Sequence, residues 1–219
     1  MLLEISTSFS QFIYTFWQNV QDTTLLEIIA VGFGIASVLF ARKENIWVYP
    51  TGIISVLIYV YILVQPDVKL YADAGINIFY FGMSVYGWYK WTQKGQNKKE
   101  LKITMNSKKD WVISVIGFAV SFVMIVFLLK WLKANDAEYW STNIPYIDSF
   151  TTAIFIVGML LMAFKKVENW TFWIIGDVIS VPLYMYKGLV FTGFQFLVFL
   201  VLAVMGYIEW RRKYLLSES

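Results

Sequence analysis

A single aspartate in the middle of an apolar segment is the side chain most able to do chemistry in this sequence. Asp177 lies within the stretch 170–187, and on a helix it shares one face with Asn169, Trp173, Ser180 and Tyr184. A carboxylate at membrane depth is costly and is functional by default. An aspartate beside aromatic faces suits a flat organic cation, because it combines charge neutralisation with cation–π contact.

Further polar side chains lie in other apolar segments. Asn77 and Gln195 carry amides that can bond sugar or alcohol hydroxyls, and Asp148 precedes the stretch 149–164. We expect these groups and the aspartate to line one polar, aromatic cavity near the membrane midplane. The candidate substrate-binding residues are Asp73, Asn77, Ser84, Asp148, Asn169, Trp173, Asp177, Tyr184 and Gln195.

Several of these features also have structural interpretations. Serines and threonines in membrane helices often bond a carbonyl one turn back, and glycines allow close helix packing. Asp73 lies near an outer boundary, where it also reads as a solvated carboxylate. Tryptophans at the ends of apolar segments are typical of the aromatic belt, and these are Trp47, Trp88, Trp91, Trp170 and Trp210.

The composition identifies an integral membrane protein. Of 219 residues, 58% are hydrophobic and only 15% are charged, which leaves too little polar surface to cover a soluble chain. The sequence has no cysteine and no histidine, so disulfides, thiolate metal sites and the usual general base are absent. We therefore expect no enzyme, no cofactor and no bound metal.

Seven apolar segments are long enough to cross a bilayer as helices. They lie at about 25–41, 46–64, 71–91, 111–132, 149–164, 170–187 and 189–210. The expected organisation is an interfacial segment 1–24, a first triple-helix repeat 25–91, a cytoplasmic loop 92–110, a linker span 111–132, an outer loop 133–148, a second triple-helix repeat 149–210 and a cytoplasmic tail 211–219.

The distribution of basic residues predicts the orientation in the membrane. Of the 18 lysines and arginines, fourteen fall on one side of the seven spans, and Lys69, Lys130, Lys133 and Lys187 fall on the other. This asymmetry places the N-terminus outside and the C-terminus in the cytoplasm. The net charge of +3 is thus a signal of topology and does not indicate a nucleic-acid partner.

The chain also contains an internal repeat. ENIWVYPTGIISVLIYVY, which starts at Glu44, matches ENWTFWIIGDVISVPLYMY, which starts at Glu168, and Gly87 and Trp91 match Gly206 and Trp210. Because an unmatched span separates the two matching triplets, the copies have the same orientation. The expected fold is an all-α integral membrane protein with seven transmembrane helices in a 3+1+3 parallel repeat, and its site lies between the halves.

The segment VENWTFWIIGDVIS, Asp148 in YIDS, and the endings YGWYKW and GYIEW resemble the PnuC family of bacterial vitamin transporters. The resemblance runs from about Leu26 to Arg212. It implies a SWEET-like architecture in the bacterial inner membrane, a homotrimer, and facilitated diffusion of nicotinamide riboside with trapping by a cytoplasmic vitamin kinase. Members that carry thiamine or riboflavin are equally similar. Asn77 and Asp177 stand where the family commonly has glutamine and asparagine, so the vitamin remains open.

Two other functions are compatible with parts of the pattern. Asp148 and Asp177 superficially supply the pair of an intramembrane aspartyl protease, but Ile174 stands where the GxGD motif requires its first glycine. A SWEET-type sugar facilitator would share the repeat, although a neutral sugar does not need a buried aspartate. For a transporter, Pro50 and Pro182 in the duplicated segments are either hinges for alternating access or static kinks.

Overall fold

The computed structural model describes residues 2–66, 71–93 and 101–218, and it describes only the backbone of residues 2–9, 12, 71–73 and 218. Within these ranges the secondary-structure elements are all helices, joined by turns and loops, apart from one isolated bridge between Thr104 and Lys166. The helices are α1 (Leu2–Asp22), α2 (Leu25–Arg42), α3 (Val48–Leu63), α4 (Tyr71–Thr92), α5 (Lys108–Leu132), α6 (Ala137–Trp140), α7 (Ile144–Ala163), α8 (Asn169–Tyr186) and α9 (Val190–Glu218).

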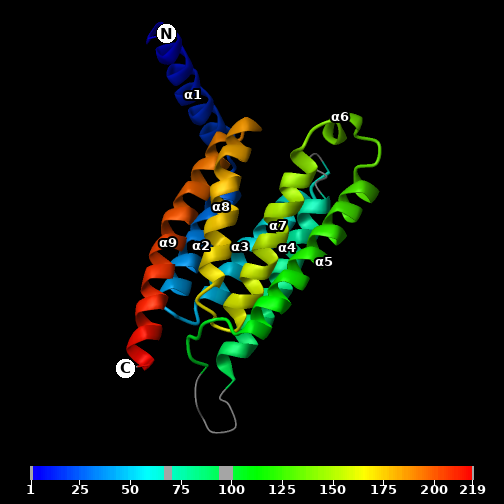
Figure 1. Cartoon of the computed structure of the whole chain (residues 1–219). Coiled ribbons are helices and arrows are strands. Elements are labelled where there is room, and N and C mark those ends of the chain that lie inside the picture. Colours follow the sequence, from blue (N-terminus) through cyan, green and yellow to red (C-terminus); the bar gives the residue numbers. More distant parts are fainter. Residues whose placement is uncertain (1, 67–70, 94–100, 219) are drawn as a thin grey trace.

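Four of these helices are long and apolar enough to cross a membrane, and they are α2, α5, α7 and α9. Helix α3 is shorter but also apolar. Figure 1 shows the long helices running side by side, so that consecutive ones point in opposite directions. An all-helical fold with several apolar spans agrees with the composition.

The helix boundaries differ from the expected segments mainly at α7 and α9. Helix α7 begins at Ile144, five residues before the predicted 149, because Pro145 occupies its first turn, where a missing amide donor costs nothing. Helix α9 continues past the predicted end at 210 to Glu218. Its basic residues after Trp210 lie outside the apolar stretch, but arginine and lysine are good helix formers and do not end the helix.

Local sequence explains where other helices start. Thr24 accepts a hydrogen bond from the Glu27 amide, and the Glu27 carboxylate accepts one from the Thr24 amide at 3.0 Å. Ser107 and Asp110 form the same reciprocal capping box at the start of α5. Each box satisfies two amides that the first helical turn leaves without a partner.

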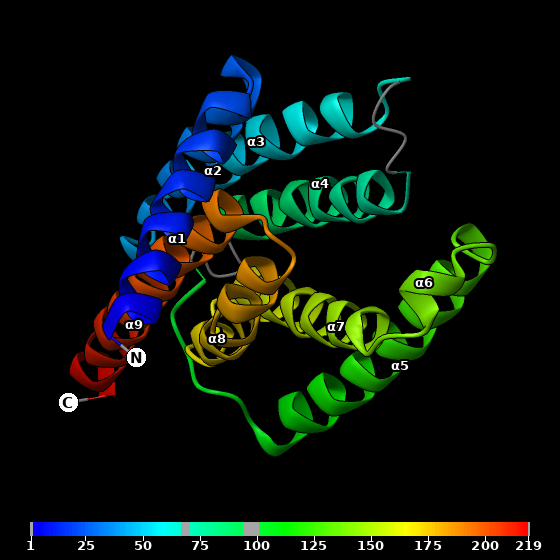
Figure 2. The same cartoon turned by 90° about the horizontal axis from the view of Figure 1, so that it is seen from above.

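The helices pack as two triplets. In the first triplet, α3 packs against both α2 and α4, and in the second triplet, α8 packs against both α7 and α9. The triplets meet where α2 packs on α9 and where α4 packs on α7. Helix α5 packs mainly on α7 and lies at the edge of the bundle in the view from above (Figure 2).

Helix α1 leaves the bundle and is held to it at its C-terminal end (Figure 1). The Asn19 side-chain oxygen accepts a hydrogen bond from the amide of Val190, the first residue of α9, at 2.9 Å. The Phe16 ring lies 5.9 Å from that of Phe194. The end of α1 thus caps the start of α9, while the interfacial position expected for 1–24 stays a prediction.

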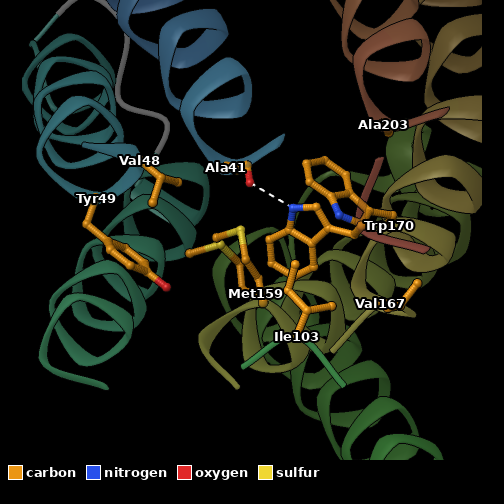
Figure 3. Close-up of a cluster of buried hydrophobic side chains, with 10 residues drawn as sticks. Ala41, Val48, Tyr49, Ile103, Met159, Val167, Trp170 and Ala203 are labelled. Atoms are coloured by element: carbon orange, nitrogen blue, oxygen red, sulfur yellow. Dashed lines mark hydrogen bonds between the residues drawn. The ribbon is translucent and has the colours of Figure 1, made fainter. Parts of the chain in front are cut away.

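The largest buried cluster lies at the end of the bundle that holds the α2–α3 and α7–α8 turns, residues 42–48 and 163–169, which we call the turn end. Figure 3 shows side chains from several helices and from the segment before α5 meeting there. The buried members of the cluster are Ala41, Val48, Tyr49, Ile103, Met159, Met162, Val167, Trp170, Ala203 and Trp210.

Two repeat-related tryptophans hold the triplets together at this end. Trp91, from α4, donates a hydrogen bond from Nε1 to the Met162 carbonyl of α7 at 3.2 Å. Trp210, from α9, donates from Nε1 to the Ala41 carbonyl of α2 at 3.0 Å. Both bonds cross from one triplet to the other, so these tryptophans have a structural role that the aromatic belt does not describe.

The glycines one turn before these tryptophans make room for large rings. A Cβ built on Gly206 would lie 2.7 Å from three ring atoms of Trp170, and a Cβ on Gly87 would meet the ring of Tyr49. The Gly-x-x-x-Trp element thus occurs once in each triplet. In both, its glycine lets an aromatic ring of the middle helix, α3 or α8, pack closely against the next helix, α4 or α9.

Candidate functional site

Asp177 is buried inside the second triplet. It lies in the middle of α8 and is only 2% exposed, and Ser180, one turn further along the same face, is 1% exposed. Within the described part of the chain, every ion pair joins other residues, so no lysine or arginine neutralises this carboxylate. An uncompensated buried carboxylate attracts a cation and rejects an anion.

A column of four aromatic rings lies beside this stretch of α8. Trp173 stacks on Phe155 with centroids 5.2 Å apart and planes 24° apart, and Phe155 stacks on Phe196 at 6.1 Å and 7°. Tyr184 then stacks on Phe196 at 4.9 Å and 24°. The rings come from α7, α8 and α9 and are nearly parallel. Because they already stack on one another, an aromatic ligand can stack only on the rings at the two ends of the column, Trp173 and Tyr184.

Sequence reasoning missed Phe155 and Phe196, since a phenylalanine in an apolar helix looks like any other lipid-facing or core residue. One signal was present in a glycine of α8 and a glycine of α7. A Cβ built on Gly176 would meet the Phe155 ring, so the ring of Phe155 lies directly over the glycine beside Asp177. Gly158, on α7, likewise makes room for a ring, because a Cβ built on it would lie 3.3 Å from Cε2 of Trp173.

Polar groups connect this region to the first triplet. The Tyr59 side chain, from α3, lies near the Gln195 side chain of α9. Tyr80, from α4, lies close enough to Tyr184 of α8 for the two hydroxyls to interact electrostatically. Asn77 is half-buried one turn before Tyr80 on α4. Of the predicted residues, Asn77 thus lies on α4 of the first triplet, and Tyr184 and Gln195 lie on α8 and α9 of the second.

Other predicted site residues lie elsewhere. Asp148 forms an ion pair with Lys187, 2.7 Å from Oδ1 to Nζ, and accepts a hydrogen bond from the Tyr139 hydroxyl at 3.2 Å. These contacts join the start of α7 to the end of α8, at the end of the bundle opposite the turn end. Asp148 therefore already has a cationic partner and is a poorer candidate for a ligand cation than Asp177.

Asn169 and Ser84 are buried in packing positions. Asn169, the first residue of α8, is fully buried, and its side-chain amide donates to the Lys166 carbonyl. Ser84 is buried where α4 packs on α3, with its hydroxyl 3.9 Å from a Cβ built on Gly52. The side chain of Asp73 lies outside the described residues.

The arrangement of the described side chains suits binding better than bond-making chemistry. A carboxylate without an ion-pair partner, stacked aromatic rings, and amide and hydroxyl groups from both triplets are the parts of a site for a flat, cationic molecule with a polar appendage. Among the described residues, no group of three or more acidic side chains is placed to hold a metal ion.

Comparison with known proteins agrees with this organisation. A family model described as nicotinamide mononucleotide transporter matches residues 24–212. The nicotinamide riboside transporter PnuC of Escherichia coli (strain K12) is 29% identical over 207 residues, covering 86% of each chain. The riboflavin/roseoflavin transporter RibM of Streptomyces davaonensis is 24% identical over 177 residues, covering 81% of this chain and 80% of that one.

A solved structure has the same fold. It is the crystal structure of the vitamin B3 transporter PnuC, and it superimposes with a TM-score of 0.65 at 22% identity, covering 92% of this chain and 88% of that chain. With its apolar helices, the protein is a multi-pass membrane protein. Since the family model spans nearly the whole sequence, this chain belongs to the nicotinamide mononucleotide transporter family, that of the PnuC proteins.

Proposed function

We propose that this protein is a transporter, and not an enzyme, that takes up a small cationic aromatic vitamin across the bacterial inner membrane. Nicotinamide riboside is the leading substrate, because it combines a flat cationic ring with a sugar. The observation that carries the proposal is Asp177, which is buried beside the aromatic column and has no ion-pair partner among the described residues. Charge neutralisation selects the cation, and stacking selects a flat ring.

The proposed division of roles follows the two triplets. The second triplet supplies Asp177, Trp173 and Tyr184 for the ring, and the first triplet, with Gln195 of α9, supplies amide and hydroxyl groups for the sugar. A site that draws on both triplets is the arrangement that alternating access requires, since movement of one triplet against the other opens it to either side.

The proposed architecture has seven spans, α2–α5 and α7–α9, in a SWEET-like 3+1+3 parallel repeat. Two packing relations support it. The contact of α2 with α9 and that of α4 with α7 exchange under a two-fold relation between the triplets, and so do the hydrogen bonds of Trp210 and Trp91. The division into a first repeat 25–91, a linker span 111–132 and a second repeat 149–210 belongs to the same proposal.

The proposed orientation has the N-terminus outside and the turn end in the cytoplasm, because the two turns, the segment 90–109 and the end of α9 together carry fourteen of the 18 basic residues. Of the residues counted for this, Lys69, Lys94, Lys98 and Lys99 lie outside the described residues. Transport by facilitated diffusion, trapping by a cytoplasmic vitamin kinase, and a homotrimer complete the proposal from the resemblance.

Binding measurements distinguish the substrates. Isothermal titration of the detergent-purified protein with nicotinamide riboside, thiamine, riboflavin and a neutral sugar compares two cationic vitamins, one neutral vitamin and the substrate class of a sugar facilitator. We expect the tightest binding for nicotinamide riboside. Tight binding of thiamine would identify a different cationic vitamin as the substrate and leave the role of Asp177 unchanged. Preferential binding of riboflavin or sugar would contradict the role given to the Asp177 carboxylate.

A proline inside α8 is the proposed hinge. Pro182 lies one turn beyond Asp177 and removes a backbone hydrogen bond from the helix, which permits bending there. Pro182→Ala is expected to lower the rate of nicotinamide riboside uptake into proteoliposomes more than it weakens equilibrium binding. Val181→Ala is the matched control in the same turn. Equal uptake rates for Pro182→Ala and the unmodified protein would identify a static kink.

A further inference from the structure

The segment before α5 is tied to the second triplet. Residues 101–107, which we call the strap, run beneath the α7–α8 turn. The Thr104 amide donates to the Lys165 carbonyl at 3.1 Å, and the Val167 amide donates to the Thr104 carbonyl at 3.0 Å. Two residues further on, the Asn106 amide donates to Glu168 Oε2 at 2.9 Å. A segment expected to be an ordinary polar loop is therefore held by backbone and side-chain bonds.

An ion pair adds a further tie at the end of the strap. Lys166 Nζ lies 2.9 Å from Asp110 Oδ2 in the first turn of α5, and it also donates to the Met105 carbonyl at 3.3 Å. Lys166 is opposite Thr104 in the isolated parallel bridge. The turn that joins α7 to α8 thus holds the strap through hydrogen bonds of the turn's backbone and through the side chains of Lys166 and Glu168.

One apolar side chain of the strap, that of Ile103, is buried in the cluster at the turn end. Ile103 is 7% exposed and belongs to the same buried cluster as Tyr49 of the first triplet and Trp170 of the second. Figure 3 shows Ile103 below Met159 and Trp170. This isoleucine, which follows Lys102, is thus buried in a cluster to which both triplets contribute side chains.

Several polar side-chain atoms of the turn end and the strap are buried without a hydrogen-bond partner. Within the described residues these are the Tyr49 hydroxyl, Trp170 Nε1, Asn169 Oδ1 and both polar atoms of the Asn106 side-chain amide. Buried polar groups are normally hydrogen-bonded, and a group of exceptions in one place needs an explanation.

We propose that the strap is a lock, a segment that holds the turn end closed. It must move away from the α7–α8 turn before the substrate can leave the protein at that end. This inference rests on the proposed function, since an exit matters only to a transporter. The ties of Thr104, Asn106 and Lys166 hold the lock closed, and the buried Ile103 side chain anchors it in the cluster at the turn end. Movement of the strap then becomes a step of the transport cycle on the cytoplasmic side.

The chain has no cysteine, so a disulfide can pin the strap without removing other thiols. Thr104 and Lys166 are directly paired, which brings two introduced cysteines within the range that a disulfide spans. We expect oxidised T104C/K166C to bind nicotinamide riboside with an unchanged Kd but to lose uptake into proteoliposomes, with dithiothreitol restoring uptake. The single variants T104C and K166C, treated identically, are the controls. Uptake by the oxidised pair at the rate of the reduced pair would overturn the proposal.

A second measurement does not depend on the substrate. In I103C, the rate of maleimide labelling reports how often the strap leaves its buried position. Adding E168Q weakens the tie to the Asn106 amide and is expected to raise that rate severalfold, whereas the matched change E138Q, in α6 at the opposite end, should leave it unchanged. An unchanged rate in I103C/E168Q would contradict the lock.

The two experiments separate the lock from the transport function. If the unmodified protein binds none of the vitamins but the maleimide labelling of I103C rises with E168Q, the proposed function fails and the closure by the strap stands. If the protein carries nicotinamide riboside with the disulfide intact, the lock is wrong and the function stands.

Discussion

Replacement of Asp177 by asparagine is expected to weaken binding of nicotinamide riboside by about a hundredfold, which corresponds to about 2.7 kcal/mol. The carboxylate is 2% exposed and has no cationic partner among the described residues, so its attraction for a bound cation is poorly screened. A pair of charges 4 Å apart at an effective dielectric constant of about 20 gains about 4 kcal/mol, and desolvation offsets part of it. Isothermal titration in detergent measures the change.

The matched control is Asp148→Asn. That carboxylate belongs to an ion pair with Lys187 and lies at the far end of α7, so its loss should leave the Kd of nicotinamide riboside within about threefold of the unmodified value. A larger effect for Asp148→Asn than for Asp177→Asn would move the site to that end of the bundle. Full binding by Asp177→Asn would favour a neutral substrate such as riboflavin or a sugar.

Gly206→Ala is expected to lower the free energy of unfolding by about 2–3 kcal/mol, because it overpacks a site with no room for a methyl group. The new Cβ would lie 2.7 Å from three ring atoms of Trp170, which is itself buried against Trp210 with ring centroids 5.6 Å apart. The ring cannot move away without breaking the packing that holds Trp210 on the Ala41 carbonyl. The melting temperature in detergent, followed by tryptophan fluorescence, reports the loss.

Two further glycines make the comparison specific. Gly87→Ala introduces a methyl group into the ring of Tyr49 at the repeat-related position of the first triplet, so a loss of similar size is expected. Gly82→Ala lies on the same helix, where no atom is within 4 Å of the new Cβ, and it should be neutral or slightly stabilising. A melting temperature for Gly206→Ala equal to that of Gly82→Ala would show that the packing of Trp170 against α9 is looser than described.

Much of the architecture was accessible from the sequence because its causes are local. Apolar runs bounded by polar residues predicted the long helices, and the capping boxes at Thr24 and Ser107 explain two of their starts. The repeat of Gly87 and Trp91 in Gly206 and Trp210 predicted two equivalent positions, and the structure places both tryptophans in hydrogen bonds between the triplets. The family resemblance is confirmed by the model that matches residues 24–212.

The site was only partly predictable. Periodicity on α8 brought Trp173 and Asp177 together because residues three and four apart share a helix face. It said nothing about Phe155 and Phe196, which join the column from other helices, and it grouped Asp148 with the site although Lys187 holds it elsewhere. Which residues of separate helices meet depends on helix packing, and periodicity within one helix does not contain that information.

By itself, the sequence determined the class of protein, its long helices, its internal repeat and its family. Hydrophobic patterning and helix caps act over a few neighbouring residues, and a repeat is visible as matching residues in two parts of the sequence. Only the tertiary structure decided that Asp148 pairs with Lys187, that Trp210 donates to the Ala41 carbonyl, and that Ile103 is buried at the turn end. These contacts join residues far apart in the chain, and their formation depends on how the two triplets and the strap fit together.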